Sequence, residues 1–175
     1  MSVQSRADVL VIVMSAVLVL TGLQWVTLKP RDPVQVELEG EEVDWRAPGL
    51  PKALASELQW VWDALRSASR TRSLVLFYNG HCLMQVGVAP PGMALGSAAP
   101  GPICQQAMKS GTGNYLANLV LFPGRLEFAA YLPANCQAAL IQPVGPQGVL
   151  VAGSDTQRGY TRLDQAWVSS VADKL

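Results

Sequence analysis

Three side chains in this sequence are the types best suited to chemistry, and they lie in two places. His81 is the one histidine of the 175 residues, and Cys82 follows it directly. An imidazole can ligate an iron atom or transfer a proton, and a neighbouring thiol can act as a transient ligand. Because His81 follows the turn dipeptide Asn79-Gly80, we expect it at the surface, and a strand cysteine is more often a small core residue. His81 and Cys82 are therefore weak candidates for a cofactor-binding pair.

The third side chain is Arg125, within the sequence FPGRLEF. After the Pro-Gly turn we expect a strand, which would place Arg125 and Glu127 on one face. The simpler interpretation is a surface ion pair that contributes less than about 1 kcal/mol. The functional interpretation is a contact with a partner or with an anionic group, because a guanidinium matches a carboxylate in geometry. The sequence favours the first interpretation and leaves the second open.

Other signatures of catalysis or metal binding are missing from the sequence. No G-x-S-x-G, H-E-x-x-H, P-loop or G-x-G-x-x-G motif occurs, so catalytic residues are unknown and no metal site is expected. Cys82, Cys104 and Cys136 are widely spaced and form no C-x-x-C motif, which is typical of free, buried thiols in a reducing compartment. The 13 basic and 13 acidic residues give a net charge of zero, without a basic face that would bind nucleic acid.

Apolar spacing and turn residues predict the elements that must position these side chains. Asn79-Gly80 between two apolar runs predicts a tight hairpin, and Thr161 with Asp164 resembles a capping box that opens the last helix. That helix should bury the stripe Leu163, Trp167, Val171 and Leu175. The predicted helices cover Lys52 to Ser69, Pro102 to Ser110 and Thr161 to Leu175, and the predicted strands cover Ser73 to Tyr78, His81 to Val88, Tyr115 to Phe122, Leu126 to Leu132, Ala138 to Pro143 and Gly148 to Gly153.

This order of elements predicts an α+β fold, in which a mainly antiparallel sheet carries flanking helices. Its last strands and final helix resemble the end of a GAF-like domain, a likeness of fold that does not by itself give a function. We expect the domain to cover residues 52–175. Residues 30–51 should form a linker or an edge strand, because Val34, Val36 and Leu38 alternate with polar residues.

A charge-free segment of 20 residues, Val9 to Leu28, precedes this domain. A helix of that length spans roughly 30 Å, the thickness of the hydrocarbon core of a bilayer. The apolar run is longer than the core of a signal peptide, and it is apolar on all sides, unlike a buried amphipathic helix. We therefore expect residues 1–29 to form a tail and a single membrane helix. Lys29 and Arg31 weakly favour a cytoplasmic location for the domain.

Several blocks of the sequence together resemble one known family. They are RADVL with the apolar segment, PGPI at residues 100–103, and the stretches at residues 114–128, 131–154 and 158–175. In this collinear order they are similar to the B-type subunits of the "cofactor assembly of complex C" family of cyanobacteria and chloroplasts. Members of that family often carry two membrane helices, whereas this sequence has one apolar segment of spanning length.

The resemblance implies a role in the biogenesis of the cytochrome b6f complex. It implies a membrane-anchored, non-catalytic factor that assists covalent attachment of the extra c-type haem to cytochrome b6 on the cytoplasmic or stromal side of the thylakoid (or plasma) membrane. The implied partners are related assembly subunits, apocytochrome b6 and membrane lipid. The resemblance implies no stably bound cofactor, with haem as a transient client, and it transfers no catalytic residues.

Two other functions remain open at the level of sequence. A membrane-tethered GAF-like sensor of small molecules would need an enclosed, ligand-sized pocket between the sheet and the helices. A haem lyase acting alone would need an accessible ligand or base that the sequence does not visibly supply.

Overall fold

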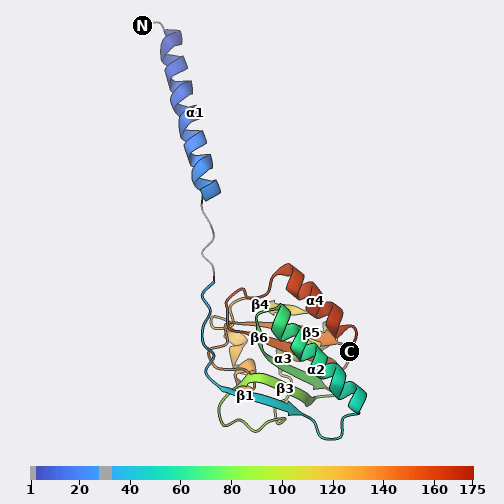
Figure 1. The fold of residues 1–175 in the computed structure, drawn as a ribbon. Coiled ribbons are helices and arrows are strands. Elements are labelled where there is room, and N and C mark those ends of the chain that lie inside the picture. Colours follow the sequence, from blue (N-terminus) through green and yellow to red (C-terminus); the bar gives the residue numbers. More distant parts are fainter. Residues whose placement is uncertain (1–2, 28–32) are drawn as a thin grey trace. The chain divides into compact units, whose positions relative to one another are not determined.

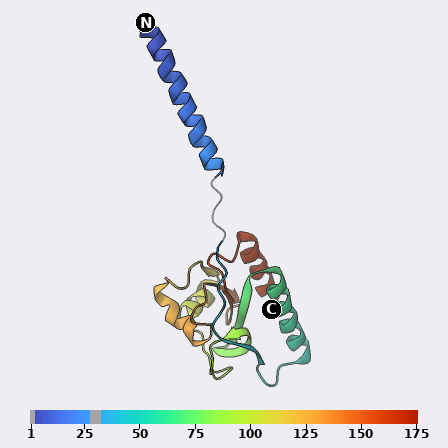
Figure 2. The same ribbon diagram turned by 60° about the vertical axis from the view of Figure 1, so that its left-hand side comes forward.

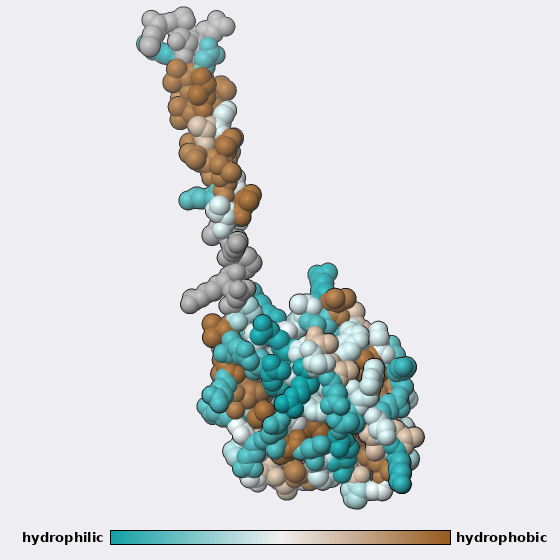
Figure 3. Space-filling view, viewed as in Figure 1, coloured by the Kyte–Doolittle hydropathy of each residue, from teal (hydrophilic) through white to brown (hydrophobic). Residues whose placement is uncertain are grey.

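The computed structural model describes residues 3–27 and 33–175, and it divides the chain into an N-terminal helix and a domain that begins at Pro33. The helix α1, Val3–Thr27, begins six residues before the predicted start, whereas its predicted last residue, Leu28, lies outside the described residues. Apolar side chains cover it on all visible sides (Figure 3). Within the described ranges, its Arg6–Thr27 portion is the one helix long and apolar enough to cross a membrane, and none of that portion is buried.

The domain is built on a six-stranded sheet in which every neighbouring pair is antiparallel (Figure 1). The order across the sheet is β1-β3-β2-β6-β5-β4. The strands are β1 Glu41–Arg46, β2 Thr71–Tyr78, β3 His81–Ala89, β4 Asn114–Leu116, β5 Ala138–Val144 and β6 Gly148–Ser154. The helices are α2 Lys52–Ala68, α3 Pro102–Ser110, the 3-10 helix η1 Pro123–Ala130 and α4 Arg162–Ala172.

Helices cover both faces of the sheet, because alternate strand residues point to opposite sides. Leu74 and Leu76 of β2 pack with α2 and α4, whereas Val75 and Phe77 of the same strand pack under α3 and η1. In Figure 2, α2 and α4 lie on one side of the domain and η1 lies on the other. This two-sided cover explains why the central strands are apolar at consecutive positions.

Local turn and cap signals worked as the sequence predicts. Asn79 and Gly80 adopt φ values of 50° and 78°, the left-handed conformations that a tight hairpin turn needs, between strands that begin and end where expected. The capping box of α4 is present, with the Thr161 hydroxyl accepting a bond from the Asp164 amide and the Asp164 carboxylate accepting one from the Thr161 amide.

Two predicted strands are wrong. Tyr115 to Phe122 contributes only the three-residue strand β4, and Leu126 to Leu132 is mostly the 3-10 helix η1. β4 is an edge strand that pairs with β5 alone, so no further ladder is available for the chain that follows it. Pro123 then starts a helical turn, for which its fixed φ is suited.

The apolar stripe predicted for the last helix is partly wrong. Leu163 is 80% exposed, and α4 instead buries Val168, Val171 and Ala172. The helix is therefore turned by about one residue from the predicted orientation, a shift that a period of 3.6 residues cannot resolve over three turns.

The segment from Pro33 to Gly40 runs along the domain and is fixed by polar contacts. The carboxylate of Asp155, which is 3% exposed, accepts bonds from Arg72 Nε at 2.8 Å and from Gln35 Nε2 at 2.8 Å. The Asn135 amide donates to the Glu37 carbonyl and accepts from the Glu39 N–H. The edge strand itself lies further along the chain than Val34 to Leu38, at Glu41–Arg46.

Candidate functional site

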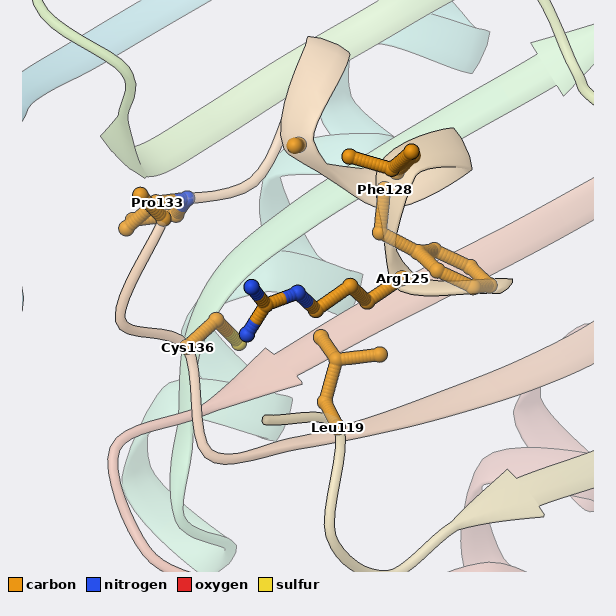
Figure 4. A pocket seen from close by; sticks show the side chains of 8 residues that line it. Leu119, Arg125, Phe128, Pro133 and Cys136 are labelled. Atoms are coloured by element: carbon orange, nitrogen blue, oxygen red, sulfur yellow. The ribbon is translucent and has the colours of Figure 1, made fainter. Parts of the chain in front are cut away.

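The candidate site is a pocket of about 220 Å³ at the base of η1, beside Arg125 (Figure 4). The Arg125 side chain extends between Leu119 and Cys136, with Phe128 and Pro133 around it. The pocket is open to solvent, because Arg125 and Leu126 are exposed. Its lining is otherwise apolar and consists of Leu119, Leu126, Phe128, Ala129, Pro133, Ala134 and Cys136.

Arg125 is the charged side chain of this pocket. Its guanidinium donates one hydrogen bond, from Nη1 to the Val120 carbonyl at 3.0 Å. The salt bridges found among the described residues join Arg46 to Asp44, Arg66 to Glu42 and Arg72 to Asp155, so none of them engages Arg125. The guanidinium therefore keeps donors that can bind a carboxylate from another molecule.

The predicted pairing of Arg125 with Glu127 on a strand is wrong. Glu127 instead accepts bonds from the backbone N–H groups of Ile103 at 2.8 Å and of Cys104 at 3.0 Å. These groups belong to the first turn of α3, where N–H groups have no partner within the helix and a negative charge is favourable. Because η1 is a 3-10 helix, Glu127 turns inward to cap α3, whereas Arg125 stays at the surface.

An exposed apolar surface lies next to the pocket. Leu121 is 79% exposed and Leu126 is 78% exposed. We call the exposed apolar residues of this segment the apolar ridge: Leu121, Pro123, Leu126, Ala129 and Ala130. The sequence did not reveal this surface, because as a strand from 126 to 132 the same residues would have been assigned partly to the core.

The three cysteines are buried and protonated. Cys82, Cys104 and Cys136 are all free, and each is at most 4% exposed. Burial raises the pKa of the Cys82 thiol to about 11, and it raises the pKa of Cys104 and of Cys136 to about 12. The thiolate is the reactive form, so these cysteines are poor nucleophiles and poor ligands in the folded domain. Cys82 is a core residue, as the simpler interpretation expected.

His81 and Cys82 do not form a common site. His81 is exposed beside the hairpin turn, whereas Cys82 packs in the core between the sheet and α3. Within residues 3–27 and 33–175, no group of three His, Cys, Asp or Glu side chains could hold a metal ion. The described domain therefore offers no arrangement in which His81 acts together with a thiol or a carboxylate.

Aromatic side chains fill the space between the sheet and the helices α3 and η1. Tyr131 packs edge-to-face against Phe77, with ring centroids 5.2 Å apart, and against Phe128 at 6.0 Å. All three are fully buried. A domain that encloses a small ligand on this face would need that volume to be empty, so the space is unsuited to a large planar cofactor.

The fold defines the chain's described domain as a member of the GAF class. The GAF domain of a two-component sensor histidine kinase from Bacillus halodurans matches with a TM-score of 0.53 and 18% identity, over 70% of this chain and 90% of that one. A type II free methionine-R-sulfoxide reductase from Thermoplasma acidophilum matches with a TM-score of 0.52 and 18% identity, over 68% and 86%. At this identity the likeness concerns the fold alone.

The family is given by sequence. The CCB2/CCB4 family, described as B-type subunits for "Cofactor assembly of complex C", matches over residues 1–175. The chain is 40% identical over 182 aligned residues to the chloroplastic Arabidopsis thaliana protein CCB4, which is named for the same cofactor assembly of complex C. This chain belongs to that family, whose members are subunits for cofactor assembly of complex C, the cytochrome b6f complex. The match covers 99% of this chain and 61% of the length of the Arabidopsis relative.

Proposed function

We propose that this chain is a membrane-anchored assembly factor that assists covalent attachment of the extra c-type haem to cytochrome b6. The observation that carries the proposal is the 40% identity, over 99% of the chain, to a protein named for cofactor assembly of complex C. The proposal goes further than that name, because it specifies the haem, the client and the step.

The chemistry of the domain supports a binding role in place of a catalytic one. Haem attachment through a thioether needs a reactive thiol on the client and groups that orient the haem, but the thiols of this domain are buried with raised pKa values. The chain would act by holding related assembly subunits and apocytochrome b6 together. Haem would then be a transient client that this domain does not bind stably.

Helix α1 would supply the membrane anchor. The Arg6–Thr27 portion has 22 residues, which corresponds to about 33 Å of helix. Lys29 and Arg31 follow it, and basic residues are enriched on the cytoplasmic side of membrane helices. In this arrangement the domain faces the cytoplasm or stroma, in a thylakoid or plasma membrane.

Co-purification from membranes tests partners and ligand together. The full chain, solubilised with its membrane and isolated by a tag, should carry apocytochrome b6 or related assembly subunits. Stripped of partners, it should show no haem absorption band. Isolation of the full chain with stoichiometric haem after the partners are removed would contradict this proposal and favour direct haem chemistry.

The alternative of a small-molecule sensor receives less support. The aromatic cluster of Phe77, Phe128 and Tyr131 occupies the volume that such a sensor would use. The pocket beside Arg125, at about 220 Å³, is smaller than the roughly 300–1,000 Å³ of typical small-molecule sites.

A further inference from the structure

We propose that the apolar ridge and the pocket beside Arg125 together bind one segment of a partner protein, in which an apolar side chain and a carboxylate lie close in sequence. The inference rests on the proposed function, since it names the surface through which an assembly factor would hold a partner. It assigns Leu121 and Leu126 to apolar contact and Arg125 to recognition of the carboxylate.

The ridge is apolar and firmly held. Single exposed leucines are common on protein surfaces, but Leu121 and Leu126 are both nearly 80% exposed and lie only five residues apart. Backbone bonds fix the turn between them: the Leu119 N–H donates to the Gln137 carbonyl at 2.8 Å, and the Phe122 N–H donates to the Leu119 carbonyl at 3.1 Å. A surface that is already ordered loses little conformational entropy on binding.

The pocket has the size of one side chain. Its volume of about 220 Å³ lies below the usual range for drug-sized ligands, and its walls are mostly carbon. A leucine or phenylalanine from a partner would fit, whereas a porphyrin ring would not. The pocket adjoins the ridge through Leu126 and Ala129, which belong to both.

The charge of this surface selects the partner. Between Ala117 and Cys136 the sequence holds two charged residues, Arg125 and Glu127. Glu127 is engaged with the first turn of α3, so Arg125 leaves the ridge locally positive. The complement of a guanidinium set in apolar surroundings is a carboxylate with apolar neighbours.

Photo-crosslinking in native membranes identifies the bound segment. A photoreactive amino acid is placed at Leu126 of the full chain, and a matched one is placed at Leu163. Leu163 is 80% exposed on α4, which packs on the opposite face of the sheet. We expect an adduct at position 126 to a peptide of another protein that carries Asp or Glu within about four residues of a large apolar residue, and no such adduct at position 163.

The identified segment, made as a labelled peptide, then measures the affinity of the full chain in detergent. We expect Arg125→Glu and Leu126→Asp each to weaken binding by about tenfold or more, while Leu163→Asp leaves it unchanged. Exchange of the peptide carboxylate for lysine should restore binding to Arg125→Glu. Arg125→Lys, which keeps the charge, should bind within about tenfold of the unchanged chain and checks that the loop is intact.

Four outcomes would overturn the inference. They are an adduct to a second copy of this chain, adduct yields at position 126 no higher than at position 163, affinity that does not respond to the charge exchange, and titration with haem that gives an absorption shift abolished by Arg125→Gln. Failure of the assembly role is seen separately. A strain without the chain that still attaches haem normally would refute the proposed function without removing a verified adduct.

Discussion

At the scale of single residues, the side chains with chemical potential divide into buried and exposed groups. The thiols of Cys82, Cys104 and Cys136 are inside the domain, whereas Arg125 and His81 are at the surface. A domain that used its thiols would expose at least one of them in an electropositive setting. The observed distribution supports binding through Arg125 and its apolar neighbours.

The burial of the thiols predicts their reactivity. In the folded full chain at pH 8, a thiol reagent such as Ellman's should modify none of the three cysteines within minutes, because each is at most 4% exposed and protonated. In denaturant all three should react. Rapid modification of one thiol in the native chain, with its circular dichroism unchanged, would contradict this and make that cysteine a candidate again.

The raised thiol pKa values also predict how stability depends on pH. In the unfolded chain these thiols lose their protons near pH 9.0, whereas in the folded domain they keep them to about pH 11–12. Between those values the folded state binds more protons, so the free energy of unfolding falls as pH rises, by up to about 1.4 kcal/mol per pH unit for each thiol. Urea unfolding at pH 7.5 and pH 10.5 checks this, and equal midpoints would refute it.

At the scale of elements, the sequence predicts what is determined locally. Asn79-Gly80 specifies a hairpin through its left-handed backbone, and Thr161 with Asp164 specifies a helix start through its own hydrogen bonds. The region from Leu116 to Leu132 was predicted poorly, because its conformation depends on distant partners. There, β4 has no second neighbour, and Glu127 binds a helix that begins more than twenty residues earlier.

The candidate site divides in the same way. Arg125 could be singled out from its residue type, but the ridge could not, because Leu126 looks like a core residue until η1 turns it outward. Asp155 was not recognised either, since its partners Gln35 and Arg72 lie far away in sequence. Adjacent polar residues after a buried strand, Asp155 and Thr156, were the one available signal.

Removal of the cap that Glu127 provides should weaken α3. Glu127→Ala leaves two backbone N–H groups of α3 without an acceptor, so we expect the free energy of unfolding to fall by about 1 kcal/mol. Glu57→Ala, at an exposed position of α2, should change it by less than about 0.5 kcal/mol. Chemical denaturation compares the two, and a Glu127→Ala variant as stable as the Glu57→Ala control would disprove the capping role.

Asp155 should hold the segment Pro33 to Gly40 on the domain. Asp155→Ala removes the acceptor of Arg72 and Gln35, and we expect a loss of about 2 kcal/mol, moderated by the partial exposure of Arg72. Protease Glu-C should then cleave after Glu37 and Glu39 faster than in the unchanged chain. Asp173→Ala, at the exposed end of α4, is the control, and equal cleavage in both variants would show that Asp155 does not fix this segment.

At the scale of the whole molecule, the chain combines an apolar helix of spanning length with a GAF-class domain whose interior is filled. Length and the absence of charge predict the helix, and the order of elements predicts the fold. The family connects them to complex C. We interpret the molecule as a docking platform held at a membrane, with a surface, and not a cavity, as its working part.

The most direct test is haem staining of cytochrome b6 after denaturing electrophoresis, in a strain that lacks this chain. We predict that the covalent haem band disappears while the non-covalent b haems remain in the membrane spectrum, and that the unchanged chain restores the band. Complementation with Leu126→Asp should fail although the protein accumulates, whereas Leu163→Asp should succeed. A normal haem-staining band in the strain without the chain would contradict the proposed role.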